Sequence, residues 1–522
     1  MSRQNYHQAR WNEPILFELG SEGERGILIP PFEMEAGQRS GREAQIPAPM
    51  RRAAPPCLPQ ISQVEVLRHY LRLSQENLGA GLIPDFGMAT STMKYNPPIN
   101  EQLVRNPKFT ALHPLQDEST VQGILEIMYK LEQFLKEISG MDRVSLQPRA
   151  GSQAIYANIA MIRAYHARRG EAHRDEIITT LFAHPSDAAV PSAAGYKIVT
   201  LYPEETGYPS VDALKAAVSE RTAGLFITNP DDTGIFNPHI RDFTEIVHAA
   251  GGLCAYDQAN ANGLLGITRA RESGFDLCQF NLHKTFSTPY ASGGSATGAS
   301  CVTAALAPSL PVPTVEFDGE KHYLNYDLPD SIGKVASFYG VAANYIRAYA
   351  WIMAHGADGL REVAHSAVLN NNYLLKKILE IPGITAPYGS GQPRIDQVRY
   401  SWEKLLKETA LKIEYISNRS ADFAMHFFFS HHPHAVPDPA TLEPTESYSK
   451  RDIDEYAAAW AQLAEEVRHK PEVIKNAPYN TPIHKMTDFS FLTDPAKWAA
   501  TWRAYRKKHA HHDKTLDFDQ PS

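Results

Sequence analysis

Two residues in the middle of this 522-residue sequence have the types and placement needed for covalent chemistry on an amine. Lys284 directly follows the short apolar stretch Leu277–Phe280, within the segment Asn281–Phe286. Asp257 ends a second apolar stretch, Gly252–Tyr256. A lysine and a carboxylate at the ends of two buried strands suit pyridoxal phosphate, which needs a Schiff-base lysine and an acidic partner for its pyridinium nitrogen. On these two residues alone, a loop lysine and a helix-capping aspartate explain the pattern equally well.

Two other segments follow predicted strands and offer groups for the same cofactor. Gly151, Ser152 and Gln153 lie between a strand and a helix, where free N–H groups and a hydroxyl make a phosphate cradle. His184 comes just after a strand that ends at Leu181, and its imidazole could stack on a pyridine ring or shuttle a proton. A structural histidine is the more frequent explanation for a single residue of this kind.

Three further residues lie at the ends of the next strands. Thr228 and Asn229 end a buried strand before a proline and could hydrogen-bond a ring substituent, although turn formation explains them equally well. Ala259 follows Asp257 and could complete the wall behind a ring. The order along the chain, from glycine turn through histidine, Asn-Pro and aspartate to lysine, predicts one cofactor site.

Strands and helices are predicted to alternate through the middle of the chain, which indicates an α/β fold with a mostly parallel sheet sandwiched by helices. The predicted strands are Val144–Leu146, Glu176–Leu181, Lys197–Leu201, Ala223–Thr228, Leu253–Tyr256 and Leu277–Phe280. The predicted helices are Ser62–Asn77, Ser119–Gly140, Gln153–Arg168, Val211–Val218, Ile240–Ala250, Val335–Ala354 and Leu360–Leu379. Ligands of such sheets bind at the carboxyl ends of the strands, where Asp257 and Lys284 are expected.

Four regions are expected along the chain. A proline-rich extended arm covers 1–60 and a large cofactor-binding domain covers 61–380. A smaller C-terminal α+β domain follows at 381–506, with a strand at Ala424–Phe429 and a helix at Ile453–His469. Residues 507–522 form a charged tail.

Composition excludes several classes of function. The net charge of −8, with no basic stripe, argues against nucleic-acid binding. No apolar run approaches eighteen residues, and the polar amino terminus lacks the apolar region of a secretory signal.

The cysteines and histidines indicate no metal centre. Four cysteines with neither metal-ligand nor disulfide spacing predict a reducing compartment, the cytoplasm. The histidine clusters at 431–434 and 509–512 fall in loop-like or tail contexts without an ordered ligand geometry, so no metal is expected.

Several longer segments carry a family resemblance over roughly residues 10–485. They are Thr92–Pro97, His113–Gln116, Thr120–Gly123, Ser145–Pro148, Asn281–Pro289, Leu310–Pro313, Glu443–Glu446 and Asn476–Pro482. The chain resembles the second (beta) subunit of the two-subunit glycine dehydrogenase (decarboxylating), the P-protein of the glycine cleavage system. It is similar also to the carboxyl-terminal half of the single-chain form.

The resemblance implies a fold-type I pyridoxal-phosphate transferase. Lys284 would hold the cofactor, Asp257 would pair with the pyridinium nitrogen, and His184 would stack over the ring. Ser152, Gln153 and His283 would lie near the phosphate. In the family, glycine loses its carboxylate as CO2 and the remaining aminomethyl group passes to the lipoyl arm of the H-protein. An alpha subunit is the expected partner, in an alpha–beta dimer of dimers, with a homodimer as the alternative.

The chain departs from the family pattern in two parts of the expected site. Where the family reads Ser-Ala-His-Gly-Thr-Asn-Pro, this chain has Phe182–Ala188, which puts Asp187 near the expected place of a substrate carboxylate. Where the family has a nearly all-glycine loop, this chain has Tyr290–Gly298 with added side chains, and Ser91 replaces a family cysteine.

Three functions therefore stay open at this stage. The chain is a glycine decarboxylase, or a paralogue that acts on another amino substrate or acceptor without the lipoyl partner, or a non-catalytic scaffold subunit of the same fold. Retention of both Lys284 and Asp257 argues against the scaffold, which needs neither.

Overall fold

The computed structural model describes residues 7–27, 45–52, 58–78, 82–88, 92, 94–113, 115–288, 296–427, 435–482 and 485. The chain divides into two compact units. One contains Leu78–Ala477, and the other contains Tyr6–Asn77 with Pro478–Ser522. The predicted tail at 507–522 and much of the predicted arm at 1–60 lie outside the described residues. The division of the chain into four regions therefore stays a prediction.

A seven-stranded sheet forms the centre of the first unit, in the order β1-β7-β6-β5-β4-β2-β3. Its strands are β1 (Arg143–Ser145), β2 (Glu176–Thr180), β3 (Lys197–Leu201), β4 (Thr222–Thr228), β5 (Leu253–Gln258), β6 (Leu277–Asn281) and β7 (Gly298–Val302). The strands from β2 to β6 pair in parallel, whereas β7 is antiparallel to both β6 and β1. The predicted mostly parallel sheet is therefore confirmed.

Both faces of the sheet are buried because alternate side chains of each strand enter different hydrophobic clusters. In β4, Leu225 and Ile227 pack into one cluster and Phe226 into the other. The first cluster also takes in α5 (Gln122–Ser139), α9 (Ile240–Ala249) and α10 (Ala342–Leu379), and the second takes in α6 (Gly151–Arg168). Helices α7 (Ser186–Ala193) and α8 (Val211–Ala217) pack beside β3. The expected sandwich of helices around the sheet follows from this alternation.

Gly140 ends α5 as the sequence predicts. Its φ of 73° lies in the left-handed region that glycine adopts without strain, and its N–H donates to the Lys136 carbonyl. This cap stops the helix just before β1 and so sets where the first strand of the sheet begins.

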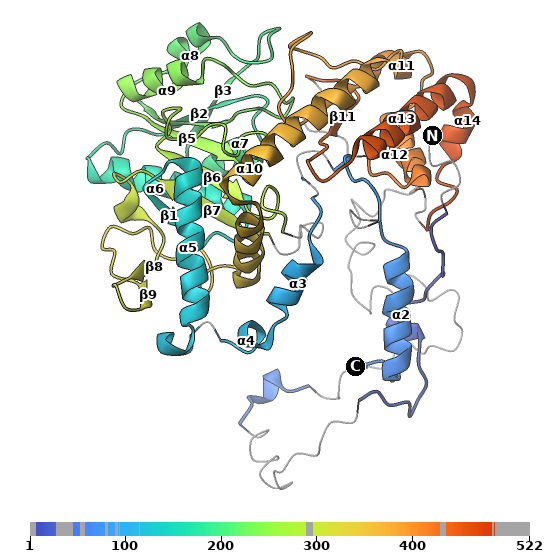
Figure 1. Ribbon diagram of the computed structural model, residues 1–522, viewed down its shortest axis with the longest axis horizontal. Coiled ribbons are helices and arrows are strands. Elements are labelled where there is room, and N and C mark those ends of the chain that lie inside the picture. The colour runs from blue at the N-terminus through green and yellow to red at the C-terminus, as the bar shows by residue number, and fades with distance from the viewer. Residues whose placement is uncertain are drawn as a thin grey trace. The chain divides into compact units, whose positions relative to one another are not determined.

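A second cluster of buried apolar residues lies in the C-terminal part of the same unit. It surrounds the two-stranded sheet of β10 (Val398–Ser401) and β11 (Pro439–Leu442) and includes Trp402 and Trp460 with ring centroids 5.0 Å apart. The helices here are α11 (Glu403–Lys407), α12 (Ile413–Ser420), α13 (Lys450–His469) and α14 (Pro471–Asn476). Figure 1 shows α10 leading from the helices beside the large sheet toward α11, and α10 packs against α13.

The remaining elements are short. In the first unit they are α3 (Pro98–Val104), α4 (Pro107–Thr110), the hairpin of β8 (Thr314–Phe317) and β9 (His322–Asn325), and the 3-10 helices η3 (Glu118–Thr120), η4 (Ala307–Ser309) and η5 (Ala421–Phe423). The second unit holds η1 (Leu16–Glu18), η2 (Ala48–Met50) and α2 (Gln63–Gln75). Among the described residues, no helix has the length and apolar character needed to cross a membrane.

Two predicted elements differ from the structure. The strand Ala424–Phe429 is wrong over its described part, because Ala424 adopts a left-handed φ of 57° at the end of η5 and residues 424–427 form no strand. The two helices expected at 335–354 and 360–379 form the single run α10, which starts only at Ala342. Gly356, with φ 63° and ψ −176°, breaks its helical geometry between the two predicted segments.

We expect Leu374→Ala to lower the free energy of unfolding by about 2–5 kcal/mol, because it leaves a cavity in the C-terminal cluster. Leu374 lies on α10 and is 0% exposed. The matched control is Leu369→Ala on the same helix, where the side chain is 70% exposed and the change should stay within about 0.5 kcal/mol. Urea unfolding followed by circular dichroism measures both, and equal losses would contradict the assigned burial.

Candidate active site

The carboxyl ends of β4, β5 and β6 bring three of the predicted residues to one edge of the sheet. Thr228 of β4 pairs in register with Asp257 of β5, which in turn pairs with Gln279 of β6. Lys284 follows β6 after a tight turn, in which its N–H donates to the Asn281 carbonyl at 3.0 Å. The His184 N–H donates to Thr228 Oγ1 at 3.2 Å, so the segment after β2 joins the same edge. The chain path reverses between β2 and β4, which is where such sheets bind ligands.

Asp257 is a buried carboxylate with one satisfied oxygen and one open oxygen. Oδ1 accepts from the Ala259 N–H at 2.7 Å and from Gln279 Nε2 at 2.6 Å. Within the described part of the chain, no donor reaches Oδ2. A buried acceptor left in this state is costly, and a cationic N–H such as a pyridinium would satisfy it. Ala259 therefore supports Asp257 through its backbone.

Asp187, at the start of α7, lies directly against Asp257. Thr228 Oγ1 donates to Asp187 Oδ2 at 2.8 Å, and the side chain is fully buried. Burial, and then the neighbouring charge of Asp257, raise the pKa of Asp187 well above its usual range. This carboxyl is therefore not a free negative charge turned toward a substrate, as the sequence alone suggested. It is part of the packing around Asp257.

Lys284 and His283 are both buried side chains. Burial and then the charge of Lys284 lower the pKa of His283 to about 3, so its imidazole is neutral at physiological pH. The N–H and the carbonyl oxygen of Thr297 both lie 3.0 Å from His283 Nδ1, so the Thr297 backbone holds this nitrogen in either tautomer. His283 is thus fixed in one orientation beside the lysine.

Two further carboxyl groups near Lys284 were not predicted from the sequence. Burial raises the pKa of Glu443 to about 8 and that of Asp396 to about 7, while the charge of Lys284 partly opposes both increases. Glu443 accepts from Thr92 Oγ1 at 2.8 Å, from Asn262 Nδ2 at 2.9 Å and also from Asn260. The one sequence signal was the motif Glu443–Glu446 directly after β11, which nothing local connects to the lysine.

Lys94 also reaches the lysine loop. Its Nζ donates to the Thr285 carbonyl at 2.8 Å and pairs with Glu446 at 2.9 Å, and it lies 4.9 Å from the centroid of the Trp351 ring. Because Thr285 is the residue after Lys284, this buried cation fixes the backbone that carries the lysine.

The glycine turn lies at the start of α6, close to the start of α7. Ser152 Oγ and Ser186 Oγ are 3.1 Å apart, so the positive ends of two helices meet there. A Cβ added at Gly151 would lie 2.5 Å from Asn281 Oδ1, which leaves no room for a side chain. This turn has the shape and polarity of a phosphate cradle.

The side chains of Gln153 and Asn229 bond to backbone groups of the protein instead. Gln153 Oε1 accepts from the Arg149 N–H at 2.7 Å, and its Nε2 donates to the Val335 carbonyl at 2.5 Å. Asn229 Oδ1 accepts from the Asn237 N–H at 2.8 Å, and its Nδ2 donates to the Asn237 carbonyl at 3.3 Å. Turn formation, the alternative given above, thus describes the Asn229 side chain. His184 Nδ1 accepts from the Ser186 N–H at 3.2 Å.

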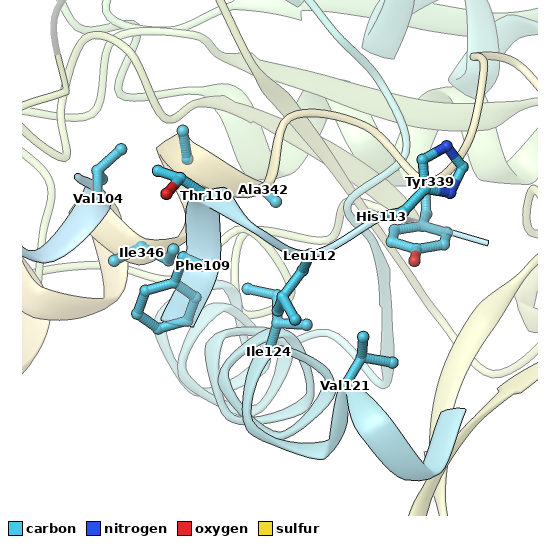
Figure 2. Close-up of a pocket in the computed structure, with 11 residues that line it drawn as sticks. Val104, Phe109, Thr110, Leu112, His113, Val121, Ile124, Tyr339, Ala342 and Ile346 are labelled. Atoms are coloured by element: carbon cyan, nitrogen blue, oxygen red, sulfur yellow. The ribbon is translucent and has the colours of Figure 1, made fainter. Parts of the chain in front are cut away.

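An apolar pocket of about 190 Å³ lies elsewhere in the same unit, between α4, α5 and α10 (Figure 2). Phe109, Leu112, Ile124 and Ile346 line it, with His113 and Tyr339 toward one side of the view. It shares no residue with the strand-end cluster and offers few polar groups, so it is not the site of the chemistry.

Among the described residues, one group of side chains has the types of metal ligands. His248, Cys254 and Asp276 have ligand atoms within 4.8 Å of one another. His248 Nε2 already pairs with Asp276 Oδ2 at 2.7 Å, the Cys254 N–H donates to the same oxygen, and burial raises the pKa of the thiol. Hydrogen bonding therefore accounts for this group. The histidine clusters at 431–434 and 509–512 lie outside the described residues.

Comparison with known proteins decides the family. No family model matches the sequence. The chain is 42% identical over 507 residues to a probable glycine dehydrogenase (decarboxylating) subunit 2 of Pyrococcus abyssi, covering 96% of this chain and 98% of the relative. The chain belongs to the glycine dehydrogenase (decarboxylating) subunit 2 family. A Caldanaerobacter subterraneus relative of the same description is 38% identical over 486 residues, covering 93% and 98% of the two chains.

Solved structures agree with this family on the fold. A glycine decarboxylase (P-protein) of the glycine cleavage system, in inhibitor-bound form, matches with a TM-score of 0.69 at 20% identity, covering 84% of this chain and 100% of that one. A sphingosine-1-phosphate lyase of Burkholderia pseudomallei matches with a TM-score of 0.56 at 14% identity, covering 81% and 94%. The predicted fold type I of pyridoxal-phosphate enzymes is confirmed, and pyridoxal phosphate is the cofactor of this enzyme family.

We expect Gly151→Ala to weaken the binding of pyridoxal phosphate about tenfold or more, which corresponds to about 1.4 kcal/mol per tenfold change. The added Cβ would push the buried Asn281 amide, and with it the turn that leads to Lys284. Titration of the cofactor-free protein, followed by visible absorption, measures the affinity. The control is Gly123→Ala in the first turn of α5, where nothing lies within 4 Å of the added atom. Equal affinities for both variants would refute the cradle.

Proposed function

We propose that this chain holds pyridoxal phosphate on Lys284 and releases CO2 from glycine, leaving an aminomethyl group for a lipoyl carrier. One observation carries the assignment to these residues. A buried lysine and a buried carboxylate with an open oxygen lie at the ends of adjacent parallel strands. The family of the chain supports glycine as the substrate.

The bound cofactor supplies an electron sink for the bond that breaks at the substrate's α-carbon. Asp257 would hold a proton on the ring nitrogen through Oδ2, because Oδ1 already accepts from Ala259 and Gln279. The helix starts at Ser152 and Ser186 would hold the phosphate, and His184 would lie against the ring. His283 lies beside the lysine as a neutral group. Thr228 orients the segment that carries His184.

Glu443 and Asp396 are suited to move protons near Lys284. The pKa values of about 8 and about 7 mean that each carboxyl can hold and release a proton close to neutral pH. Their burial keeps bulk water from competing for those protons.

The hypothesis of a paralogue with another substrate loses one of its arguments, because Asp187 packs against Asp257 instead of presenting a free charge to a substrate. The second departure, at 290–298, lies mostly outside the described residues.

Partners follow from the name of the family. The description "subunit 2" supports a first, alpha subunit, and we propose a lipoylated H-protein as the acceptor. We further propose an alpha–beta oligomer, with a homodimer as the alternative, and a cytoplasmic location. The free, buried thiols of Cys254, Cys278 and Cys301 are compatible with a reducing compartment.

Lys284→Ala should abolish the visible absorption band of the cofactor, because the side chain that holds it is removed. Borohydride treatment of the wild-type protein, followed by peptide mass spectrometry, should place the reduced adduct on the peptide containing Lys284. Lys215→Ala is the control, since this lysine is exposed on α8 and should keep the band. An adduct on another lysine, or a colourless wild-type protein after loading, would refute the assignment.

Carboxyl-labelled glycine tests the reaction. Incubated with the holoenzyme, an alpha subunit of the family and lipoylated H-protein, it should release labelled CO2, and Lys284→Ala should reduce the rate to background. Labelled alanine under the same conditions is the substrate control. A protein that binds the cofactor but releases no CO2 from glycine, and changes its absorption with another amino acid, would favour the paralogue.

A further inference from the structure

Two buried carboxyl oxygens, one at the start of α7 and one at the end of β5, lack a donor among the described residues. Asp187 Oδ1 and Asp257 Oδ2 are both buried, and no described donor bonds to either. The two carboxyl groups are neighbours, because after burial the charge of Asp257 and a side-chain interaction with it both raise the pKa of Asp187. Thr228 links them, because its hydroxyl donates to Asp187 Oδ2 and its backbone pairs in register with Asp257.

One proton shared by the two groups would give both oxygens a hydrogen bond and leave the second lone pair of Asp257 Oδ2 for the ring nitrogen. Two carboxylates in contact in a buried place cannot both be charged, whereas a carboxyl beside a carboxylate forms a strong hydrogen bond. The other partners decide which group carries the proton. Asp257 Oδ1 accepts two N–H bonds, which stabilise a negative charge, while Asp187 accepts only the Thr228 hydroxyl.

We propose that Asp187 is a neutral acid that donates a hydrogen bond from Oδ1 to Asp257 Oδ2 and is a positioning residue for the cofactor's acidic partner. The role of Asp187 in positioning the cofactor's acidic partner rests on the proposed function. The proton shared by Asp187 and Asp257 does not depend on that function. Asp187 keeps Asp257 ionised and fixes the direction of the oxygen that meets the ring nitrogen. The pair carries one negative charge in total, which matches one pyridinium charge.

Few other titratable groups face this pair. Asp232, in the turn after β4, acts on Asp187 with the same sign of charge, but it is paired with Arg399 at 3.1 Å. The titratable residue in its own segment is His184, whose backbone carbonyl accepts a hydrogen bond from the Asp187 N–H at 2.8 Å. The surroundings of the pair therefore favour a protonated, neutral Asp187 over a second negative charge beside Asp257. Because burial raises the pKa of Asp187 in the folded state, the stability that this proton contributes is lost as the pH rises.

Infrared difference spectroscopy on the full-length protein tests the proton directly. A buried protonated carboxyl gives a C=O band that shifts in D2O. We expect this band to weaken in Asp187→Asn and also in Asp257→Asn, whose amide donates to Asp187 and lets it ionise. Other buried carboxyls contribute equally to wild type and variant, so the difference isolates Asp187. Asp212→Asn, at an exposed site on α8, should leave the band unchanged.

Cofactor titration separates positioning from packing. Asp187→Asn keeps a donor of the same shape and should keep the wild-type affinity for pyridoxal phosphate and its absorption spectrum. Asp187→Ala removes the donor and should bind about tenfold more weakly. The thermal midpoint of wild type should fall more steeply with rising pH than that of Asp187→Asn.

The outcomes distinguish this inference from the proposed function. A band unchanged in Asp187→Asn, or equal cofactor affinity in Asp187→Ala and wild type, would overturn the inference even if the protein binds the cofactor and turns over glycine. A wild-type protein that shows the Asp187 band but never binds the cofactor would overturn the proposed function and leave the shared proton standing.

Discussion

The parallel pairing of β4, β5 and β6 is the constraint on which the site depends. Parallel strands end at the same edge, so residues from separate segments of the chain meet there without any local signal between them. The pairing is stable because both faces are covered by apolar clusters, one that includes α5, α9 and α10 and one that includes α6. The strand that positions Asp257 is thereby buried along its whole length.

Burial of this edge also determines its electrostatics. Charged groups are unstable away from water unless they are paired, so ion pairs and shifted pKa values are expected at this edge. Lys94 is paired with Glu446, Asp232 with Arg399, and His283 stays neutral. Asp257 Oδ2 has no donor among the described residues other than the proposed Asp187 carboxyl, and its second lone pair can accept from a ligand.

Much of the central sheet could be predicted because local patterns determine it. The short apolar stretches ending near Thr228, Asp257 and Asn281 formed strands at nearly the predicted bounds, and Gly140 capped its helix. The strand β7 was missed, since its small residues Gly298–Cys301 resemble a loop in isolation. Glu443 and Asp396 were missed for a different reason: only tertiary packing brings β11 and the segment before β10 to Lys284. The inward position of Asp187 likewise depends on contacts with β4 and β5.

The contact of Lys94 with both Thr285 and Glu446 has a consequence for the order in which the protein is made. Glu446 is synthesised about 160 residues after Lys284, so the lysine loop leaves the ribosome long before its last support exists. The central sheet can form while the chain is still growing, but the contacts that hold the lysine loop are complete only after the segment that follows β11 is made. Under the proposed function, Lys284 would therefore bind the cofactor late in synthesis.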